Sequence, residues 1–186
     1  MLETGISGCY EIISSSFSDA RGELTVTLNV PLLREMGLSS NFCYDYYSVS
    51  RPGVLRGFHF QAPPCAQTKL VYCISGEVLD AVLDVRKDSP TYGKVVFIRL
   101  SPNLKNMVYI PEGLAHAFMA TGKSDSILFY HTSHPYSPTH EGGILWNSVD
   151  ASWPVDNPVL SERDSLFPEF GVFDTPFRLA TAHDQK

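Results

Sequence analysis

Two short stretches of the 186-residue chain hold histidines in settings that suit chemistry. Residues 54–61 read VLRGFHFQ, with Arg56 and His59 among apolar residues. Residues 111–118 read PEGLAHAF, where the P-x-G-x-x-H spacing predicts that His116 follows a turn at the start of a strand. An imidazole, with an ordinary pKa of about 6.5, serves as a base, an acid or a metal ligand. The residues around each histidine decide between these roles.

A metal site is the first hypothesis for such histidines. A site of imidazoles and a carboxylate needs a second histidine two positions after His59, but the sequence continues HFQAPPC. A three-imidazole site therefore cannot be built there. His131, His134 and His140 lie together in a loop-like segment, which keeps a metal site as an alternative, although surface or turn histidines are the plainer interpretation.

Regular strand geometry places Arg56 and His59 on opposite faces, because successive side chains of a strand alternate. Glycine within a strand often marks a bulge that redirects a side chain. If both residues face one pocket, we expect Gly57 to lie at such a bulge.

Runs rich in Val, Ile, Phe, Tyr and Thr recur between turn signals and predict antiparallel strands. They cover residues 23–30, 69–86, 94–101, 106–113 and 126–133. Within residues 78–86, alternation places charged side chains on one face and apolar side chains on the other. Ser75 and Gly76 suit a tight hairpin turn between the two halves of residues 69–86.

Helical signals are few and short. Residues 31–38 begin with a proline, and residues 160–167 offer Ser161 as an N-cap. The pattern predicts an all-β fold, a double-sheet jelly roll or a barrel, with a few short helices mainly near the two ends of the chain.

Size and composition predict one domain over residues 1–186, with residues 155–186 as a short helix and a loosely ordered TAHDQK tail. The net charge of −6 argues against a nucleic-acid partner. The chain shows neither a secretory signal nor an apolar run of the ~18 residues that a membrane helix needs, so we expect a cytoplasmic protein. Cys9, Cys43, Cys65 and Cys73 are expected to be reduced and mostly buried.

Six stretches, which include the two histidine segments and follow the same order along the chain as in the family, resemble the nucleotide-sugar 3,5-epimerases typified by dTDP-4-dehydrorhamnose 3,5-epimerase. They are FSDARGEL, GVLRGFHFQ, QTKLVYCISGEVLDAVLDVRKDSPTYGK, IPEGLAHAF, YSPTHEGGILWN and WPVDNPVLSERD. The resemblance implies a cupin-like jelly roll, or double-stranded β-helix, without metal or other cofactor. Such proteins are usually homodimers, with an interface that we expect to involve residues 1–50. The resemblance also implies inversion of the carbons beside the 4-keto group of a nucleotide-linked 6-deoxy sugar.

The chemistry that this resemblance implies needs a base, an acid on the opposite face and a cation for the enolate. His59 matches the family's base and Asp164 its carboxylate partner. Lys69 matches a lysine near the enolate oxygen, and Tyr130 matches the acid, a role open to a phenol if nearby positive charge lowers its pKa.

The remaining family positions imply substrate binding. Arg56 and Arg21 match pyrophosphate contacts, with Arg21 supplied by the partner subunit, and Tyr136 matches an aromatic residue near the nucleobase. Further substrate-binding positions are His116, Asp80, Gln61, Tyr44 and Tyr46.

The chain departs from the family's dTDP-specific members around the nucleotide. Val26 stands where they usually have a glutamate, and Tyr44 and Tyr46 stand where they have glutamine and asparagine. Such changes alter hydrogen bonding and volume, so we predict altered nucleotide preference, with CDP or GDP sugars as candidates. The alternatives are a 3-only or 5-only epimerase, a metal-dependent cupin enzyme and a non-catalytic sugar-nucleotide binder.

Overall fold

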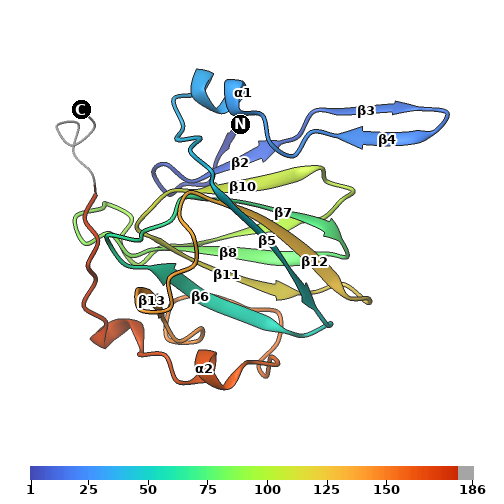
Figure 1. The fold of residues 1–186 in the computed structure, drawn as a ribbon. Coiled ribbons are helices and arrows are strands. Elements are labelled where there is room, and N and C mark those ends of the chain that lie inside the picture. Colours follow the sequence, from blue (N-terminus) through green and yellow to red (C-terminus); the bar gives the residue numbers. More distant parts are fainter. Residues whose placement is uncertain (180–186) are drawn as a thin grey trace.

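The computed structural model describes residues 1–179, so the predicted order of the TAHDQK tail lies outside the described residues. Two antiparallel sheets face each other (Figure 1). The first has six strands in the order β1-β2-β10-β7-β12-β5 and the second has five in the order β13-β6-β11-β8-β9. This arrangement confirms the all-β jelly-roll prediction.

The strands of the six-stranded sheet are β1 (Leu2–Glu3), β2 (Tyr10–Ile13), β5 (Tyr44–Ser50), β7 (Lys69–Ser75), β10 (Asn106–Ile110) and β12 (Ser126–Thr132). Those of the five-stranded sheet are β6 (Leu55–Gln61), β8 (Val78–Asp84), β9 (Val95–Leu100), β11 (Leu114–Ala120) and β13 (Glu141–Gly143). The separate hairpin of β3 (Ser16–Asp19) and β4 (Gly22–Thr25) extends away from both sheets (Figure 1).

Helices are short and lie where they were predicted. Helix α1 (Val30–Glu35) has a proline in its first turn, and α2 (Glu162–Ser165) begins after Ser161, whose hydroxyl accepts a hydrogen bond from the Asp164 amide. A 3₁₀ helix, η1, follows at Phe170–Val172. The strand predicted over residues 23–30 is wrong beyond Thr25, because Asn29 caps α1 and Val30 is its first residue.

The predicted hairpin at Ser75 and Gly76 is also wrong. Strand β7 pairs with β10 and β12, whereas β8 pairs with β11 and β9, so the turn carries the chain from one sheet to the other. Turn residues indicate where a chain reverses but not which strands then pair, and in a jelly roll consecutive strands often change sheets.

The two faces of β8 pack into two different hydrophobic clusters. Val78 and Val82 pack into the cluster between the sheets, while Ala81 and Leu83 pack into a second cluster on the other face of the five-stranded sheet. Both faces are therefore buried, and Asp80 lies inside the jelly roll rather than on a solvated surface.

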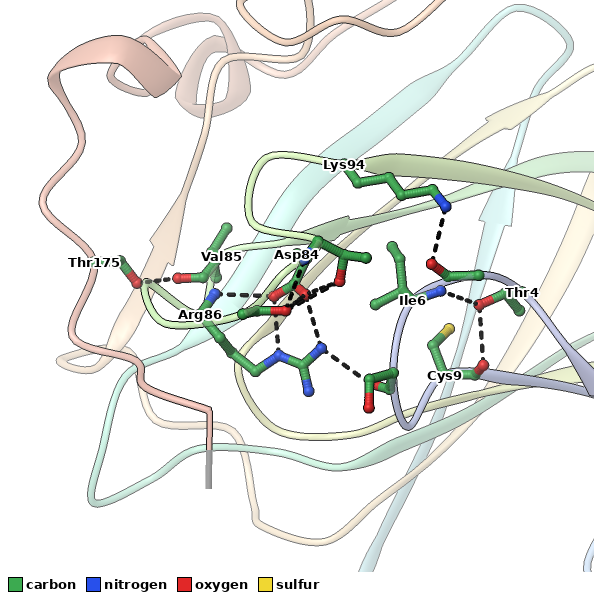
Figure 2. A network of polar contacts seen from close by, with 12 residues as sticks. Thr4, Ile6, Cys9, Asp84, Val85, Arg86, Lys94 and Thr175 are labelled. Carbon is green, nitrogen blue, oxygen red and sulfur yellow. Dashed lines mark hydrogen bonds and ion pairs between the residues drawn. The ribbon is translucent and has the colours of Figure 1, made fainter. Parts of the chain in front are cut away.

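The far end of β8 carries a polar network that holds distant parts of the chain together (Figure 2). The Asp84 carboxylate accepts hydrogen bonds from the Arg86 guanidinium and from two hydroxyls, those of Ser89 and Thr91. Burial alone would raise the Asp84 pKa, but these bonds outweigh it and the pKa is lowered. Arg86 also donates to the Ser7 carbonyl, which fastens the N-terminal segment to this end of the sheet.

The four cysteines are free thiols, as predicted. Cys9 and Cys73 are buried, Cys65 is partly buried and Cys43 is exposed, so the expectation that most are buried holds for half of them. In the described part of the chain, no helix is long and apolar enough to span a membrane.

The bulge predicted at Gly57 is present in β6. Between Arg56 and His59 strand β6 advances three residues, while its partner β11 advances two, from Phe118 to His116. Gly57 has φ +125°, and a Cβ there would lie 2.4 Å from the Ala117 Cβ. Only glycine fits this conformation and this space.

Gly57→Ala is expected to destabilise the protein by about 2 kcal/mol more than Gly22→Ala, measured by denaturant unfolding. Gly22 is the matched control because its φ of +127° is nearly the same, yet nothing lies within 4 Å of a Cβ there. Both variants bear the backbone strain, but only Gly57→Ala adds steric overlap. Equal losses of unfolding free energy would show that the site is not tightly packed.

Candidate active site

A cavity of about 420 Å³ opens between the two sheets. Strands β5, β7 and β12 of one sheet and β6, β11 and β13 of the other contribute its walls. The segments before β7 and β13 and helix α2 complete them. Its lining residues are Tyr44, Tyr46, Ser48, Arg56, His59, Phe60, Gln61, Gln67, Lys69, His116, Phe118, Tyr130, Tyr136, Glu141 and Arg163.

The bulge at Gly57 brings Arg56 and His59 to this cavity together. Arg56 donates to the Ser50 hydroxyl at 3.0 Å and to the Val49 carbonyl at 3.2 Å, so its guanidinium is held beside edge strand β5. The bulge thus resolves the conflict between strict strand alternation and a shared pocket.

Asp164 lies behind His59. Its Oδ1 is 2.9 Å from His59 Nε2, and its Oδ2 accepts a hydrogen bond from the Gly57 amide at 3.2 Å. Burial alone would raise the Asp164 pKa, but the hydrogen bonds from His59, Gly57 and Ser161 outweigh it and the pKa is lowered. The carboxylate therefore stays charged beside the imidazole.

Burial lowers the pKa of His59, while the hydrogen bond and the charge of Asp164 oppose that shift. The imidazole is consequently neutral at pH 7, with Nε2 bonded to the carboxylate. Its ring edge also contacts Phe167 at a centroid distance of 5.6 Å. This arrangement leaves Nδ1 as the basic atom.

Lys69 begins β7 and is buried in the cavity wall. Its ammonium group donates to the His59 carbonyl oxygen at 3.5 Å. Burial lowers the Lys69 pKa to about 8, against the opposing influence of Glu141 and Asp80. Lys69 thus remains mostly charged at pH 7 in a site of low dielectric, where a charge acts strongly.

Tyr130 lies in β12 with only 5% of its surface exposed. Burial raises its pKa well above the ordinary value, Tyr46 adds to the effect, and Arg56 opposes it only weakly. Nearby positive charge therefore does not lower the pKa of this phenol, and the condition set for its role as the acid is not met. Tyr130 instead stays firmly protonated.

His116 and Asp80 form a second buried pair, with His116 Nε2 2.6 Å from Asp80 Oδ2. Burial raises the pKa of Asp80, although His116 and Lys69 oppose the shift. Asp80 Oδ1 has no hydrogen-bond partner among residues 1–179. In the strand pairing His116 is directly opposite His59, so two His–Asp pairs flank the same cavity.

The side-chain amide of Gln61 forms hydrogen bonds within the protein. Its nitrogen donates to the carbonyls of Cys65 and Pro135, and its oxygen accepts from the Ser137 amide. These bonds fix the loop that carries Tyr136, so Gln61 shapes the cavity by holding that loop.

Six residues of the cavity wall were missed from the sequence: Ser48, Phe60, Gln67, Phe118, Glu141 and Arg163. The last two are charged and interact with each other. Glu141 accepts hydrogen bonds from the Tyr136 hydroxyl at 2.6 Å and from the Arg163 guanidinium. Arg163 Nε also lies 3.6 Å from Asp164 Oδ1. The only available signal for Arg163 was its place next to Asp164 in LSERD, and Glu141 offered none beyond lying within a matched motif.

Two residues considered for the nucleotide lie away from the cavity in this chain. Arg21 is at the β3–β4 hairpin, pairs with Asp19 and has a side chain that is 90% exposed. Val26 follows the same hairpin and is likewise absent from the cavity wall, whereas Tyr44 and Tyr46 are part of it.

The prediction that His131, His134 and His140 share a loop is partly wrong. His131 lies within β12 and is buried, with Nδ1 2.7 Å from the Asp45 carboxylate, so it is neither a loop nor a surface residue. His134 and His140 do lie in the following loop. Within residues 1–179, no three His, Cys, Asp or Glu side chains gather as metal ligands would.

An NMR titration tests the environment of His59. We expect its pKa to lie below 6.5, and Asp164→Asn to lower it further, because the variant removes the charge that opposes burial. Asp45→Asn is the control, since Asp45 pairs with His131 instead. A His59 pKa that rises in Asp164→Asn would contradict this account.

Residues 3–171 match a family model described as dTDP-4-dehydrorhamnose 3,5-epimerase. The dTDP-4-dehydrorhamnose 3,5-epimerase of Shigella flexneri is 45% identical over 152 residues, which cover 80% of this chain and 83% of that protein.

Solved structures show the same similarity. RmlC of Legionella pneumophila, crystallised with dTDP-4-keto-L-rhamnose, has a TM-score of 0.91 and 30% identity, covering 96% of this chain and 98% of that one. ChmJ of Streptomyces bikiniensis, a 3'-monoepimerase in complex with dTDP-quinovose, has a TM-score of 0.87 and 30% identity, covering 92% and 88%. With the family model matched over nearly its whole length, this chain belongs to the dTDP-4-dehydrorhamnose 3,5-epimerase family.

Proposed function

We propose that this protein epimerises a dTDP-linked 4-keto-6-deoxy sugar at C3 and C5, through proton abstraction and reprotonation of an enolate. The observation that carries the proposal is that His59, Lys69 and Tyr130 line one cavity, with Asp164 hydrogen-bonded to His59. These groups have the protonation states that such a reaction needs.

Abstraction begins at the carbons beside the C4 ketone, which acidifies their protons. The neutral imidazole of His59 takes the proton, the C–H electron pair enters the enolate, and an imidazolium results. The Asp164 carboxylate stabilises that positive charge and fixes the ring, as in hydrolase dyads of the same two groups.

The enolate oxygen at C4 gains negative charge during this step. The buried ammonium of Lys69 supplies the opposing charge, and His116 supplies a second donor from β11. Removing one such donor from a pre-organised site typically costs about 2.7–4 kcal/mol of barrier.

Reprotonation comes from the opposite face of the sugar ring. Tyr130 gives its phenolic proton to the carbon, which reforms the C4 ketone and leaves a phenolate. The His59 imidazolium then releases its proton to water and the phenolate takes one up from water, so both groups return to their starting states with no net change. The raised pKa of Tyr130 keeps the phenol protonated before the reaction. Tyr130 therefore gives up its proton only to a strong base such as the enolate carbon.

For the nucleotide, we propose that Arg56 contacts the pyrophosphate and Tyr136 contacts the base. We further propose a homodimer in which residues 1–50 meet the partner and Arg21 completes its pyrophosphate site. The projecting β3–β4 hairpin, with Phe17 and Leu24 exposed, supports this arrangement. The free thiols, of which Cys43 is exposed and Cys65 partly buried, favour the reducing cytoplasm.

A mono-epimerase is the second candidate function. It is favoured by the similarity to the 3'-monoepimerase ChmJ, whose TM-score of 0.87 places it among close structural relatives. The same base and acid serve either outcome, since the sugar carbon presented to His59 determines where protons exchange.

Incubation with dTDP-4-keto-6-deoxyglucose in D₂O is expected to label both C3 and C5, as located by NMR. His59→Ala should reduce exchange by about 10²- to 10⁴-fold, because it removes the base. His134→Ala is the control, since His134 is not part of the cavity wall. Label at one carbon would establish the mono-epimerase instead, and no label would exclude the proposed reaction.

The nucleotide is tested with a panel of dTDP, CDP and GDP 4-keto-6-deoxy sugars. Tyr44 and Tyr46 in the cavity are the basis for the prediction of altered preference, whereas the named relatives support dTDP. A kcat/KM for the CDP or GDP sugar above that for dTDP would bear out altered preference. Equal or better turnover of the dTDP sugar would contradict it.

A further inference from the structure

Tyr46 lies in direct contact with Tyr130, the proposed acid. The rings of Tyr46 and Tyr130 stack at a centroid distance of 4.5 Å with an interplanar angle of 10°. The two residues are directly opposite each other in the pairing of β5 and β12, so the strand register itself enforces the contact.

In this stack, Tyr46 lies between Tyr130 and solvent. Strand β5 is an edge strand of its sheet, and Tyr46 is 37% exposed while Tyr130 is 5% exposed. On its other side Tyr130 meets the His116 ring edge-on at 5.9 Å. The phenol of Tyr130 is thus held between two rings, of which Tyr46 is the one facing solvent.

We propose that Tyr46 is a positioning residue that fixes the orientation of the Tyr130 phenol and shields it from water, so that the enolate is reprotonated from the Tyr130 face. The proposal rests on the epimerase function proposed above. It assigns to Tyr46 a role in proton delivery.

The physical consequence concerns the partition of the enolate. Once His59 has taken a proton, the enolate either receives one from Tyr130, which inverts the carbon, or receives one back from the His59 side, which restores the original configuration. A fixed, shielded Tyr130 favours inversion. A mobile Tyr130 lets more of the enolate return with retention.

In D₂O the two fates are measured separately. Deuterium in inverted product reports delivery from Tyr130, and deuterium in recovered substrate of unchanged configuration reports return from the His59 side. Tyr46→Leu keeps an apolar side chain but removes the stacking ring. It is expected to lower the ratio of inverted to retained label about tenfold, which corresponds to the upper end of an aromatic stacking energy.

Tyr46→Phe restores the ring without the hydroxyl and is expected to return the ratio to the wild-type value. Tyr47→Ala is the matched control, because Tyr47 is the next residue of β5, is 64% exposed and is not part of the cavity wall. In Tyr46→Leu, kcat for epimerisation should fall while KM changes little.

Three results would overturn the proposal. An unchanged partition ratio in Tyr46→Leu, with only KM raised, would make Tyr46 a nucleotide contact. If the ratio of inverted to retained label falls as far in Tyr46→Phe as in Tyr46→Leu, the effect belongs to the hydroxyl and not to the stacked ring. Absence of deuterium from both carbons with the wild-type protein would remove the proposed function and this role with it.

Discussion

The carboxylate of Asp164 bonds to the Gly57 amide with one oxygen and to the His59 imidazole with the other, and the arrangement of the site follows from these two contacts. The first contact anchors the bulge that turns Arg56 and His59 toward one cavity. The second fixes the ring and the tautomer of the imidazole. The N-cap of Ser161 in turn holds the start of α2, so a short helix from the end of the chain supports a strand from its middle.

Desolvation then sets the protonation states. The same burial lowers the pKa of His59, lowers that of Lys69 to about 8 and raises that of Tyr130. Because each shift favours the neutral form, the base is free of its proton and the acid retains its own at neutral pH, while Lys69 stays mostly charged. Burial alone thus prepares His59 on one sheet to act as a base and Tyr130 on the other sheet to act as an acid.

Sequence patterns predicted much of this architecture, and the failures have physical causes. Strand alternation located the charged face of β8, and the conflict between Arg56 and His59 revealed the bulge at Gly57. The sequence could not predict which strands pair. The turn at Gly76 would have the same residues whether the chain stayed in one sheet or crossed to the other. Glu141 and Arg163 were missed because only tertiary contacts bring them to the cavity. The raised pKa of Tyr130 likewise depends on burial that no local motif encodes.

The central claim is that Asp164 makes His59 an effective base, and kcat for solvent exchange in Asp164→Asn tests it most directly. The variant keeps the shape of the side chain but not its charge, so dTDP binding should be retained while kcat falls by about 10²-fold or more, without exceeding the loss caused by His59→Ala. A kcat within about tenfold of the wild-type value, equivalent to less than about 1.4 kcal/mol of barrier, would contradict the account.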